Sequence, residues 1–199
     1  MFDEKKARRV IRFIECLRHT KGEFHGKPFK LLPWQEKIIR DVFGTVRDED
    51  PSMRQYNTAY IEIPKKNGKS ELAAALGIYH LIGDGELSAE VYICAADKDN
   101  ASIVFNAAVF MLTSAAWTAK MIARGELKIV ESQKRVVYRR RVRTGNGGYK
   151  WVPLGEMRVL SSEAYSKHGY KPSCVIFDEL HAQPNRELWD VMTFGAGSG

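Results

Sequence analysis

The stretch Ile63-Pro64-Lys65-Lys66-Asn67-Gly68-Lys69-Ser70 decides the fold, because it lies between a strand pattern and a helix pattern. Residues 58–63 are rich in β-forming side chains and predict a strand, while residues 69–82 predict a helix that stops at residues 83–85. A loop in this position can wrap backbone N–H groups around a phosphate, and the helix points its positive dipole end at the same place. A lysine then neutralises charge and a serine hydroxyl suits magnesium. We therefore expect a loop that binds a triphosphate.

One position departs from the usual phosphate loop. A glycine is usual five residues before the Gly-Lys pair, and Ile63 stands there instead. Gly68-Lys69-Ser70 alone is a weak signal, and a basic turn capped by Ser70 is the other interpretation. The flanking strand and helix patterns favour phosphate binding. The expected nucleotide contacts come from Pro64, Lys65, Lys66, Asn67, Gly68, Lys69, Ser70 and Glu71.

A second signal is the apolar run at residues 174–177, which is followed directly by Asp178-Glu179. A buried strand that ends in two carboxylates places both acids at the carboxyl edge of a sheet, beside the phosphate loop. We expect Asp178 to hold magnesium through water, with Ser70, and Glu179 to polarise the water that attacks the γ-phosphate. The alternative is that the acids cap the following helix. With Lys69-Ser70 upstream, catalysis with ATP and Mg²⁺ is the favoured interpretation.

Pro33-Trp34-Gln35 forms a third element. A glutamine amide can both donate to and accept from an adenine edge, and a tryptophan can stack or pack beside it. The other interpretation is a helix start with a core tryptophan, and the residues alone do not separate the two. Trp34 and Gln35 are therefore candidate nucleotide contacts.

The order of the predicted elements indicates an α/β fold. Residues 1–57 form a helical segment, with helices at 4–19 and from Pro33 to Gly44 and a polar connection at 47–57. Strands and helices alternate in residues 58–199, which predicts a parallel sheet covered by helices on both faces. The further predicted elements are strands at 91–96, 127–130, 135–138, 157–160 and 174–177, a helix at 99–123 and a turn at 146–148.

Composition bounds the class of protein. A chain of 199 residues with 44% hydrophobic side chains can bury the core of one domain. No stretch has the ~20 apolar residues of a membrane span, and the charged start is no secretory signal, so we expect a soluble, intracellular protein. Three widely spaced cysteines predict no disulfide framework. Cys16, His19 and His25 lack a fourth zinc ligand, and ordinary helix and loop positions are favoured for them.

A net charge of +7 suggests an anionic partner, and the charge concentrates in one segment. No acid occurs between Glu131 and Glu156, and Tyr138, Tyr149 and Trp151 alternate with the basic residues. Positive charge with aromatic surface beside it suits a nucleic-acid backbone. A solvated hairpin whose charges prevent edge-to-edge association is the other interpretation. The candidate DNA-binding residues are Arg135, Arg139, Arg140, Arg141 and Arg143.

Together these motifs resemble the large terminase subunit of tailed bacteriophages, the motor that pumps DNA into preformed capsids. Residues 31–39 resemble the family's adenine motif, and residues 64–70 its deviant phosphate loop, which lacks the first glycine and carries a basic residue early on. Residues 95–101 resemble its segment after the second strand. Residues 161–169 and 175–182 resemble its acidic-strand region.

The resemblance implies an additional-strand, RecA-like P-loop ATPase core with a mostly parallel sheet, an N-terminal helical segment and a β-hairpin insertion. It also implies assembly as a ring on the portal vertex in the host-cell cytoplasm. The implied partners are double-stranded DNA, the portal protein and a small terminase subunit. A coupling motif and a C-terminal nuclease domain of RNase H type belong to the family and are absent here, so we expect a truncated motor domain.

Two roles follow from the resemblance alone. Lys65 matches a loop arginine that reaches toward the γ-phosphate, so it joins Lys69 and Glu179 as a candidate catalytic residue. A finger contributed to a neighbouring subunit could come from Lys167 or Lys171. Two other functions stay open: a superfamily 2 helicase lobe, because residues 178–181 also spell a DExH box, and a nucleotide-binding DNA or portal docking module without turnover.

Overall fold

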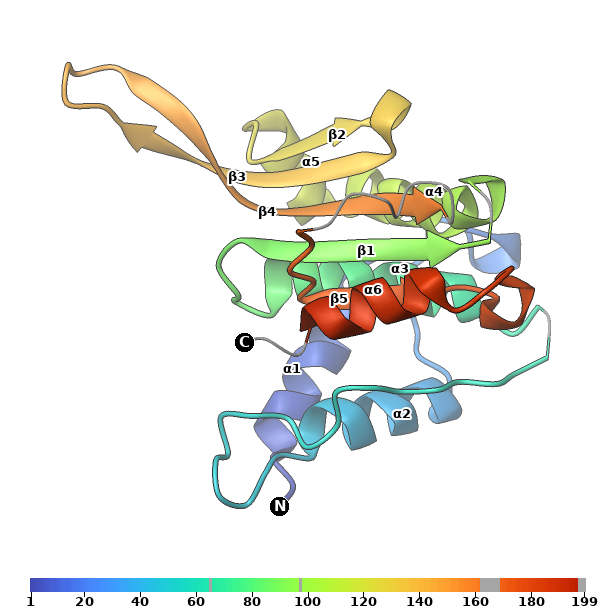
Figure 1. The fold of residues 1–199 in the computed structure, drawn as a ribbon. Helices are drawn as coiled ribbons and strands as arrows, with labels where there is room; N and C mark the ends of the chain where they lie inside the picture. Colours follow the sequence, from blue (N-terminus) through green and yellow to red (C-terminus); the bar gives the residue numbers. More distant parts are fainter. Residues whose placement is uncertain (65, 97, 162–168, 197–199) are drawn as a thin grey trace.

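A computed structural model describes the chain except residues 65, 97, 162–168 and 197–199, with the backbone alone described for 98, 99, 161 and 194–196. Its centre is a five-stranded sheet in the order β2-β3-β4-β1-β5 (Figure 1). Strands β4 and β5 both pair parallel to β1, while β2 and β4 pair antiparallel to β3. The strands are β1 (Ala89–Ala95), β2 (Leu127–Val130), β3 (Arg135–Arg143), β4 (Tyr149–Ser161) and β5 (Cys174–Phe177).

Helices cover both faces of this sheet (Figure 1). Within the described residues no single helix is long and apolar enough to cross a membrane, although one pair bent by 88° has the combined length. The α-helices are α1 (Glu4–Glu15), α2 (Pro33–Gly44), α3 (Lys69–Ile78), α4 (Lys98–Ser114), α5 (Ala116–Ala123) and α6 (Glu187–Ala196). Short 3₁₀ turns lie at η1 (Gly22–Phe24), η3 (Glu131–Gln133) and η4 (Leu180–Ala182), and a π-turn, η2 (Tyr79–Gly83), continues α3.

Strand β1, between β4 and β5, is buried on both sides, as its continuous apolar run predicts. Val91 and Ile93 belong to the main core, which α3 and α4 complete on one face. Tyr92 and Cys94 alternate to the other face and pack with Leu188 and Met192 of α6 and with Leu160 of β4. The expected α/β sheet between two helical layers is confirmed.

The strand predicted at residues 58–63 is wrong. This segment is extended but pairs with no strand among the described residues, and Tyr60 is 76% exposed. A strand forms only where its backbone N–H and C=O groups find partners, and β-forming side chains cannot supply these. The segment leads from the N-terminal helices to the phosphate loop as an exposed connection.

Two predicted helices also have different bounds. The long helix predicted at 99–123 is two helices that bend at Ala115, because Trp117 packs edge-on against Phe13 and its Nε1 donates to the carbonyl of Cys16 at 3.2 Å. The first helix ends at Glu15 instead of residue 19, because the chain beyond it pairs with the loop that follows. There Phe29 N donates to Leu17 O at 3.0 Å.

Strands β3 and β4 are longer than predicted and extend beyond their neighbours. β2 pairs with β3 only as far as Tyr138, and β1 pairs with β4 only from Gly155 onward. Among the described strands, residues 139–143 and 149–153 therefore form a ladder only with each other, after an irregularity in register at Tyr138/Arg139. We call this two-stranded segment, residues 139–153, the arm; it projects from the sheet in Figure 1.

Candidate functional site

Lys69 connects the two predicted halves of the site, although 110 positions separate it from Glu179. Its Nζ lies 3.2 Å from Asp178 Oδ1 and 3.3 Å from Glu179 Oε1. Lys69 is the first residue of α3, and the acids follow β5 directly. The structure thus brings the phosphate loop to the carboxyl edge of the parallel strands, where α/β sheets generally bind ligands.

The backbone of the loop turns sharply before α3. Gly68 and Lys66 both have positive φ, +77° and +68°, a conformation that glycine adopts freely and lysine seldom does. Asn67 Nδ2 donates to Pro64 O at 3.1 Å and holds the turn closed. These turns direct the chain into the first turn of α3, where unpaired backbone N–H groups suit an anion.

The two acids differ in their surroundings. Asp178 is only 6% exposed, and its backbone N–H donates to Cys94 O at 3.0 Å, which aligns it with β1. Glu179 has φ +54°, a strained conformation for a residue other than glycine. Strain of this kind gathers at functional sites, and here it turns the Glu179 side chain back toward Lys69. His181 Nε2 also lies 3.6 Å from Glu179 Oε2.

Electrostatics keep Lys69 charged. Burial lowers the pKa of Lys69, but the carboxylates of Asp178 and Glu179 outweigh that effect, so the pKa lies above its ordinary value. A permanently cationic amine between two carboxylates is suited to exchange one of them for phosphate oxygens when a nucleotide enters.

The adenine candidates lie on the first turn of α2 and separate into two environments. Gln35 is 3% exposed, its Oε1 accepts from Leu32 N at 2.9 Å, and its Nε2 lies against Gly68 of the phosphate loop. Trp34 is half-buried and packs on the main core. The structure therefore brings Gln35 to the loop, and gives Trp34 the contacts of a core tryptophan.

Glu71 has partners that the sequence did not indicate. Its Oε1 accepts from Thr20 N at 2.5 Å and from the Thr20 hydroxyl, and its Oε2 lies 3.1 Å from His19 Nδ1. No pattern links His19 and Thr20 to a loop about fifty positions away, so sequence reasoning left them as ordinary residues. Ser70, next to Glu71, is half-buried at the start of α3.

Several predicted residues lie elsewhere. Lys65 and the finger candidate Lys167 fall outside the described residues. Lys171 is exposed and its backbone N–H donates to Glu90 Oε2 at 3.0 Å, beside the start of β1. Gly155 pairs with Ala89, the first residue of β1, and the arm leaves the sheet at that point. Asp178 follows the other end of the parallel strands, so the arm and the Lys69–Asp178 contact lie at opposite ends of β1.

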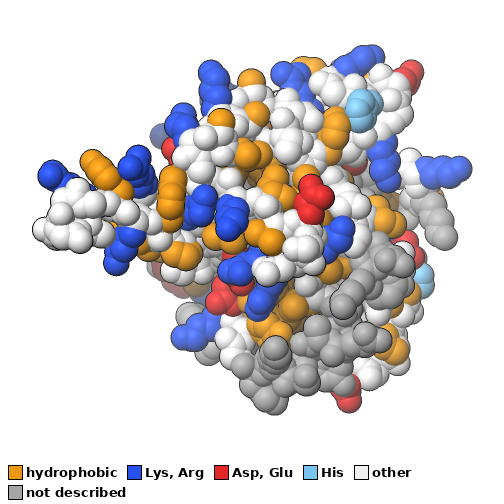
Figure 2. Space-filling view, turned by 90° about the horizontal axis from the view of Figure 1, so that it is seen from above, with side chains coloured by type: hydrophobic (Ala, Val, Ile, Leu, Met, Phe, Trp, Pro, Cys, Tyr) orange, Lys and Arg blue, Asp and Glu red, His pale blue; other side chains and the backbone are white. Residues whose placement is uncertain are grey.

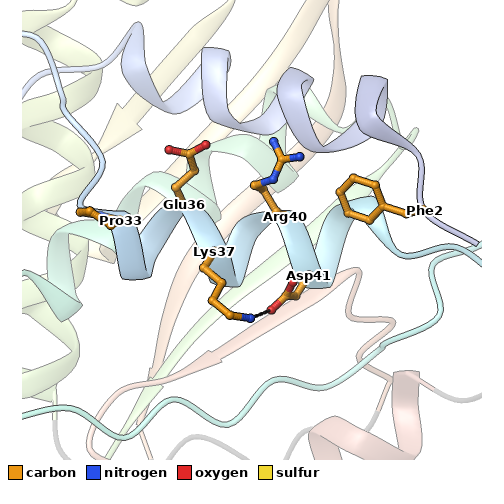
Figure 3. A pocket seen from close by; sticks show the side chains of 6 residues that line it. All are labelled: Phe2, Pro33, Glu36, Lys37, Arg40 and Asp41. Atoms are coloured by element: carbon orange, nitrogen blue, oxygen red, sulfur yellow. Dashed lines mark hydrogen bonds and ion pairs between the residues drawn. The ribbon is translucent and has the colours of Figure 1, made fainter.

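A shallow depression on α2 is separate from this site (Figure 3). Neither the phosphate loop nor the acidic pair contributes to it. The Arg40 guanidinium lies 5.4 Å from the Phe2 ring centroid, and Lys37 pairs with Asp41 at 2.5 Å. Its lining is Phe2, Pro33, Glu36, Lys37, Arg40 and Asp41.

Comparison with known proteins agrees with this geometry. Residues 33–196 match the family model of the terminase large subunit, ATPase domain. The large terminase subunit of Enterobacteria phage HK97 is 27% identical over 199 residues, which cover 97% of this chain and 34% of the relative. The chain thus spans about a third of the length of that relative.

Two solved structures share the fold. The crystal structure of the HK97 bacteriophage large terminase has a TM-score of 0.73 and 26% identity, covering 100% of this chain and 36% of the other. The ATPase domain of the Thermus phage P74-26 large terminase has a TM-score of 0.54 and 22% identity, covering 66% of this chain and 51% of the other. At that identity the second likeness concerns the fold alone.

Proposed function

The chain belongs to the family of terminase large-subunit ATPase domains, and from this membership we propose that it hydrolyses ATP to drive double-stranded DNA into a procapsid. The observation that carries the proposal is the contact of Lys69 with both Asp178 and Glu179. It joins a phosphate-binding lysine to a carboxylate pair at the one edge of the sheet where a strained backbone also directs Glu179. A structural turn and a helix cap would not require this contact.

In this proposal, different residues bind the phosphates and activate the attacking water. Backbone N–H groups at the start of α3 and the Lys69 amine bind the phosphates, and Lys69 offsets the charge that develops during transfer. Glu179 polarises the attacking water, which its partly exposed side chain can reach. The expected contact of Lys65 with the γ-phosphate remains a prediction.

Magnesium fits the donor set of the site. Mg²⁺ is usually held by one or two carboxylates together with phosphates and water, and a cluster of three protein ligands is not needed. Asp178 supplies a buried carboxylate and Ser70 a hydroxyl on the adjoining helix turn. When bound there, the ion would neutralise charge on the β- and γ-phosphate oxygens.

The base of the nucleotide is proposed to lie along the first turn of α2. The Gln35 amide is held by Leu32 and touches Gly68, so a base bound beside it would lie next to the phosphate loop. Trp34 supports this turn from the core side. Gln35 is therefore the adenine-reading residue in this proposal.

Further partners come to this chain from its family. We infer that it works in a ring at the portal vertex in the host-cell cytoplasm, with the portal protein and a small terminase subunit. Because the chain spans 34% of its HK97 relative, these belong to the activity of the whole protein. Lys171 is exposed and remains a candidate finger toward a neighbouring subunit.

DNA contact is proposed for the tip side of the arm. Arg135 pairs with Glu156, and Arg139 stacks 4.6 Å from Trp151 while its Nε donates to Gly125 O at 2.6 Å. Arg139 anchors the base of the arm, whereas Arg135 lies in β3 before the arm begins. The exposed arginines are Arg140, Arg141 and Arg143.

The arm has the charge and shape for a phosphate backbone. Arg141 lies 4.2 Å from the ring centroid of Tyr149, and Arg143 is paired across the strands with the same tyrosine. Figure 2 shows Lys and Arg side chains together with hydrophobic ones along the projecting arm. Several exposed arginines along a projecting pair of strands suit the regularly spaced phosphates of a DNA backbone.

The test is turnover by the chain and by Glu179→Gln. We expect the variant to lose roughly 100-fold or more of the ATPase rate, because the water is no longer polarised, while ATP affinity is retained. Phosphate release measures the rate and titration calorimetry the affinity. Glu15→Gln, an exposed change on α1, is the control and should leave both unchanged.

Other outcomes of this turnover test would favour a different function or a different role for Glu179. Binding without turnover in both proteins favours a nucleotide-binding docking module, whereas equal turnover removes Glu179 from the proposed role. Stimulation of turnover by the portal protein and DNA supports the motor.

A further inference from the structure

Glu71 lies next to the phosphate loop, yet both of its oxygens face the N-terminal segment. Thr20 donates its backbone N–H and its hydroxyl to Oε1, and His19 Nδ1 lies 3.1 Å from Oε2. The His19 and Glu71 side chains are 14% and 15% exposed, so water competes little for these contacts. Burial raises the pKa of Glu71, but the hydrogen bonds from Thr20 and His19 lower it by more, and the carboxylate stays charged.

His19 is fixed in one arrangement. Its Nε2 accepts from Lys30 N at 3.0 Å, so the proton of the neutral ring is on Nδ1 and is donated to Glu71. The ring stacks on Phe29, with centroids 4.3 Å apart. Residues 19–30 are therefore joined into one unit, which the Glu71 carboxylate ties to the first turn of α3.

The end of the same segment lies beside the loop. Gln35 accepts from Leu32 N at 2.9 Å, and its Nε2 is so close to Gly68 that an added Cβ there would lie 3.3 Å from it. The segment from His19 to Gln35 thus meets the phosphate loop and its helix at both ends. Glu71 holds one end, and Gly68 meets the other.

We propose that Glu71 is a positioning residue that holds residues 19–35 at a set distance from the phosphate loop and so gives the site its preference for adenine over guanine. The proposal rests on the proposed nucleotide function. Glu71 acts through His19 and Thr20, and the base is read by Gln35. The partners of the Glu71 carboxylate, His19 and Thr20, lie in the N-terminal segment. This suits a positioning role, because a carboxylate turned toward the bound phosphates would repel their negative charge.

Glu71→Gln tests the proposal with little change in shape. The amide nitrogen cannot accept a hydrogen bond, so it must oppose either the Thr20 N–H or the His19 Nδ1–H. We expect the ratio of GDP to ADP dissociation constants, measured by calorimetry with Mg²⁺, to fall about threefold to tenfold, mostly through weaker ADP binding. GDP, which the site does not select, should change much less.

Two further measurements separate positioning from general damage. Glu23→Gln, an exposed change in the same segment, should keep the wild-type ratio. Amide hydrogen exchange at Thr20 should quicken in Glu71→Gln without any nucleotide, because that N–H loses its charged acceptor. His19→Ala should lower the ratio by a similar factor, and the double variant should lower it no further, because both changes break one connection.

Several results would overturn the proposal. Equal loss of ADP and GDP affinity in Glu71→Gln would make Glu71 a phosphate or magnesium contact. An unchanged ratio of dissociation constants, or unchanged amide exchange at Thr20, would mean that Glu71 does not hold the segment in place. A wild-type ratio near one would leave no preference for Glu71 to set. Failure of the wild-type chain to bind either nucleotide would instead refute the proposed function, and the exchange at Thr20 would still report whether the tie exists.

Discussion

At the scale of single residues, backbone conformation limits the site as much as side-chain chemistry does. Gly68 has φ +77° and Gln35 Nε2 beside it, so its lack of a side chain serves both the turn and the contact. Glu179 has φ +54° and carries a side chain at that cost. The sequence predicted both residues as members of the site, but neither of these conformations.

Gly68→Ala should affect both the positive φ of that position and its contact with Gln35. A Cβ at positive φ costs about 1–2 kcal/mol, and here it would also press on the Gln35 amide. We expect ADP affinity to fall roughly tenfold, a change equivalent to about 1.4 kcal/mol. Calorimetry for binding and urea unfolding for stability measure the two effects.

Gly147→Ala is the matched control. Gly147 has φ +84° with nothing within 4 Å of an added Cβ and lies outside residues 19–35, so the variant should lose similar stability yet bind ADP normally. Equal loss of affinity in both variants would mean that Gly68 matters only through the stability of the fold.

At the scale of elements, local pattern and tertiary partners decide different features. The helix at Pro33–Gly44 and the strand at 174–177 agree with prediction, because capping, periodicity and apolar runs are local signals. Residues 58–63 have the side chains of a strand but no partner strand among the described residues, and Ala115 interrupts a helix without a proline or glycine. Both differences depend on distant segments: the first segment lacks a partner, and the helix bends where Trp117 contacts Phe13 and Cys16.

The arm gives the prediction that belongs to this scale. Changing Arg140, Arg141 and Arg143 to glutamine should weaken double-stranded DNA binding roughly tenfold and reduce the salt dependence by about one ion per arginine. Fluorescence anisotropy across a salt series measures both quantities. The change spares Arg139, whose contact with Gly125 supports the base of the arm, and Arg135, which pairs with Glu156 in the sheet.

A triple change of equal charge serves as the control. Lys5, Arg12 and Lys37 are exposed on α1 and α2, and their replacement by glutamine lowers the net charge equally. If both triple variants lose the same affinity, overall charge and not the arm attracts DNA.

At the scale of the whole molecule, a buried charge cluster connects the N-terminal segment to the core. Asp84, after the π-turn, pairs with Arg54 and lies 3.2 Å from His80 Nδ1. Burial lowers the pKa of His80, but the Cys174 sulfur and the Asp84 carboxylate raise it to about 10. Burial raises the pKa of Asp84, while His80 and Arg54 hold it well below its usual range.

Asp84→Asn should therefore destabilise the fold in a pH-dependent way. Near pH 6 we expect a loss of about 3 kcal/mol in the free energy of unfolding, because the largely buried His80 and the partly exposed Arg54 lose their counter-charge. Because the pKa of His80 is raised, the stabilisation that protonated His80 contributes is complete below pH 6.5 and is lost as the pH rises toward 10. Because the pKa of Asp84 is lowered, the stabilisation that its carboxylate contributes is lost as the pH falls below 3.8.

Urea unfolding at pH 6 and pH 9.5 checks this expectation, with Asp41→Asn, an exposed change on α2, as control. The difference between wild type and Asp84→Asn should be smaller at pH 9.5. A difference that is the same at both pH values would contradict the charged state assigned to His80.

The sequence by itself determined the class of fold and which side chains are proposed for the site. Lys69, Ser70, Asp178 and Glu179 were identifiable because phosphate and magnesium chemistry demand those side chains after strands and at helix starts, which local periodicity reveals. Only the tertiary structure decided that Glu71 faces His19 and Thr20, that Arg139 anchors the arm, and that residues 58–63 pair with no strand in the described part of the chain. The physical reason is that hydrogen bonds, ion pairs and strand pairing depend on what lies opposite a residue in space, and that neighbour is often far away in the chain.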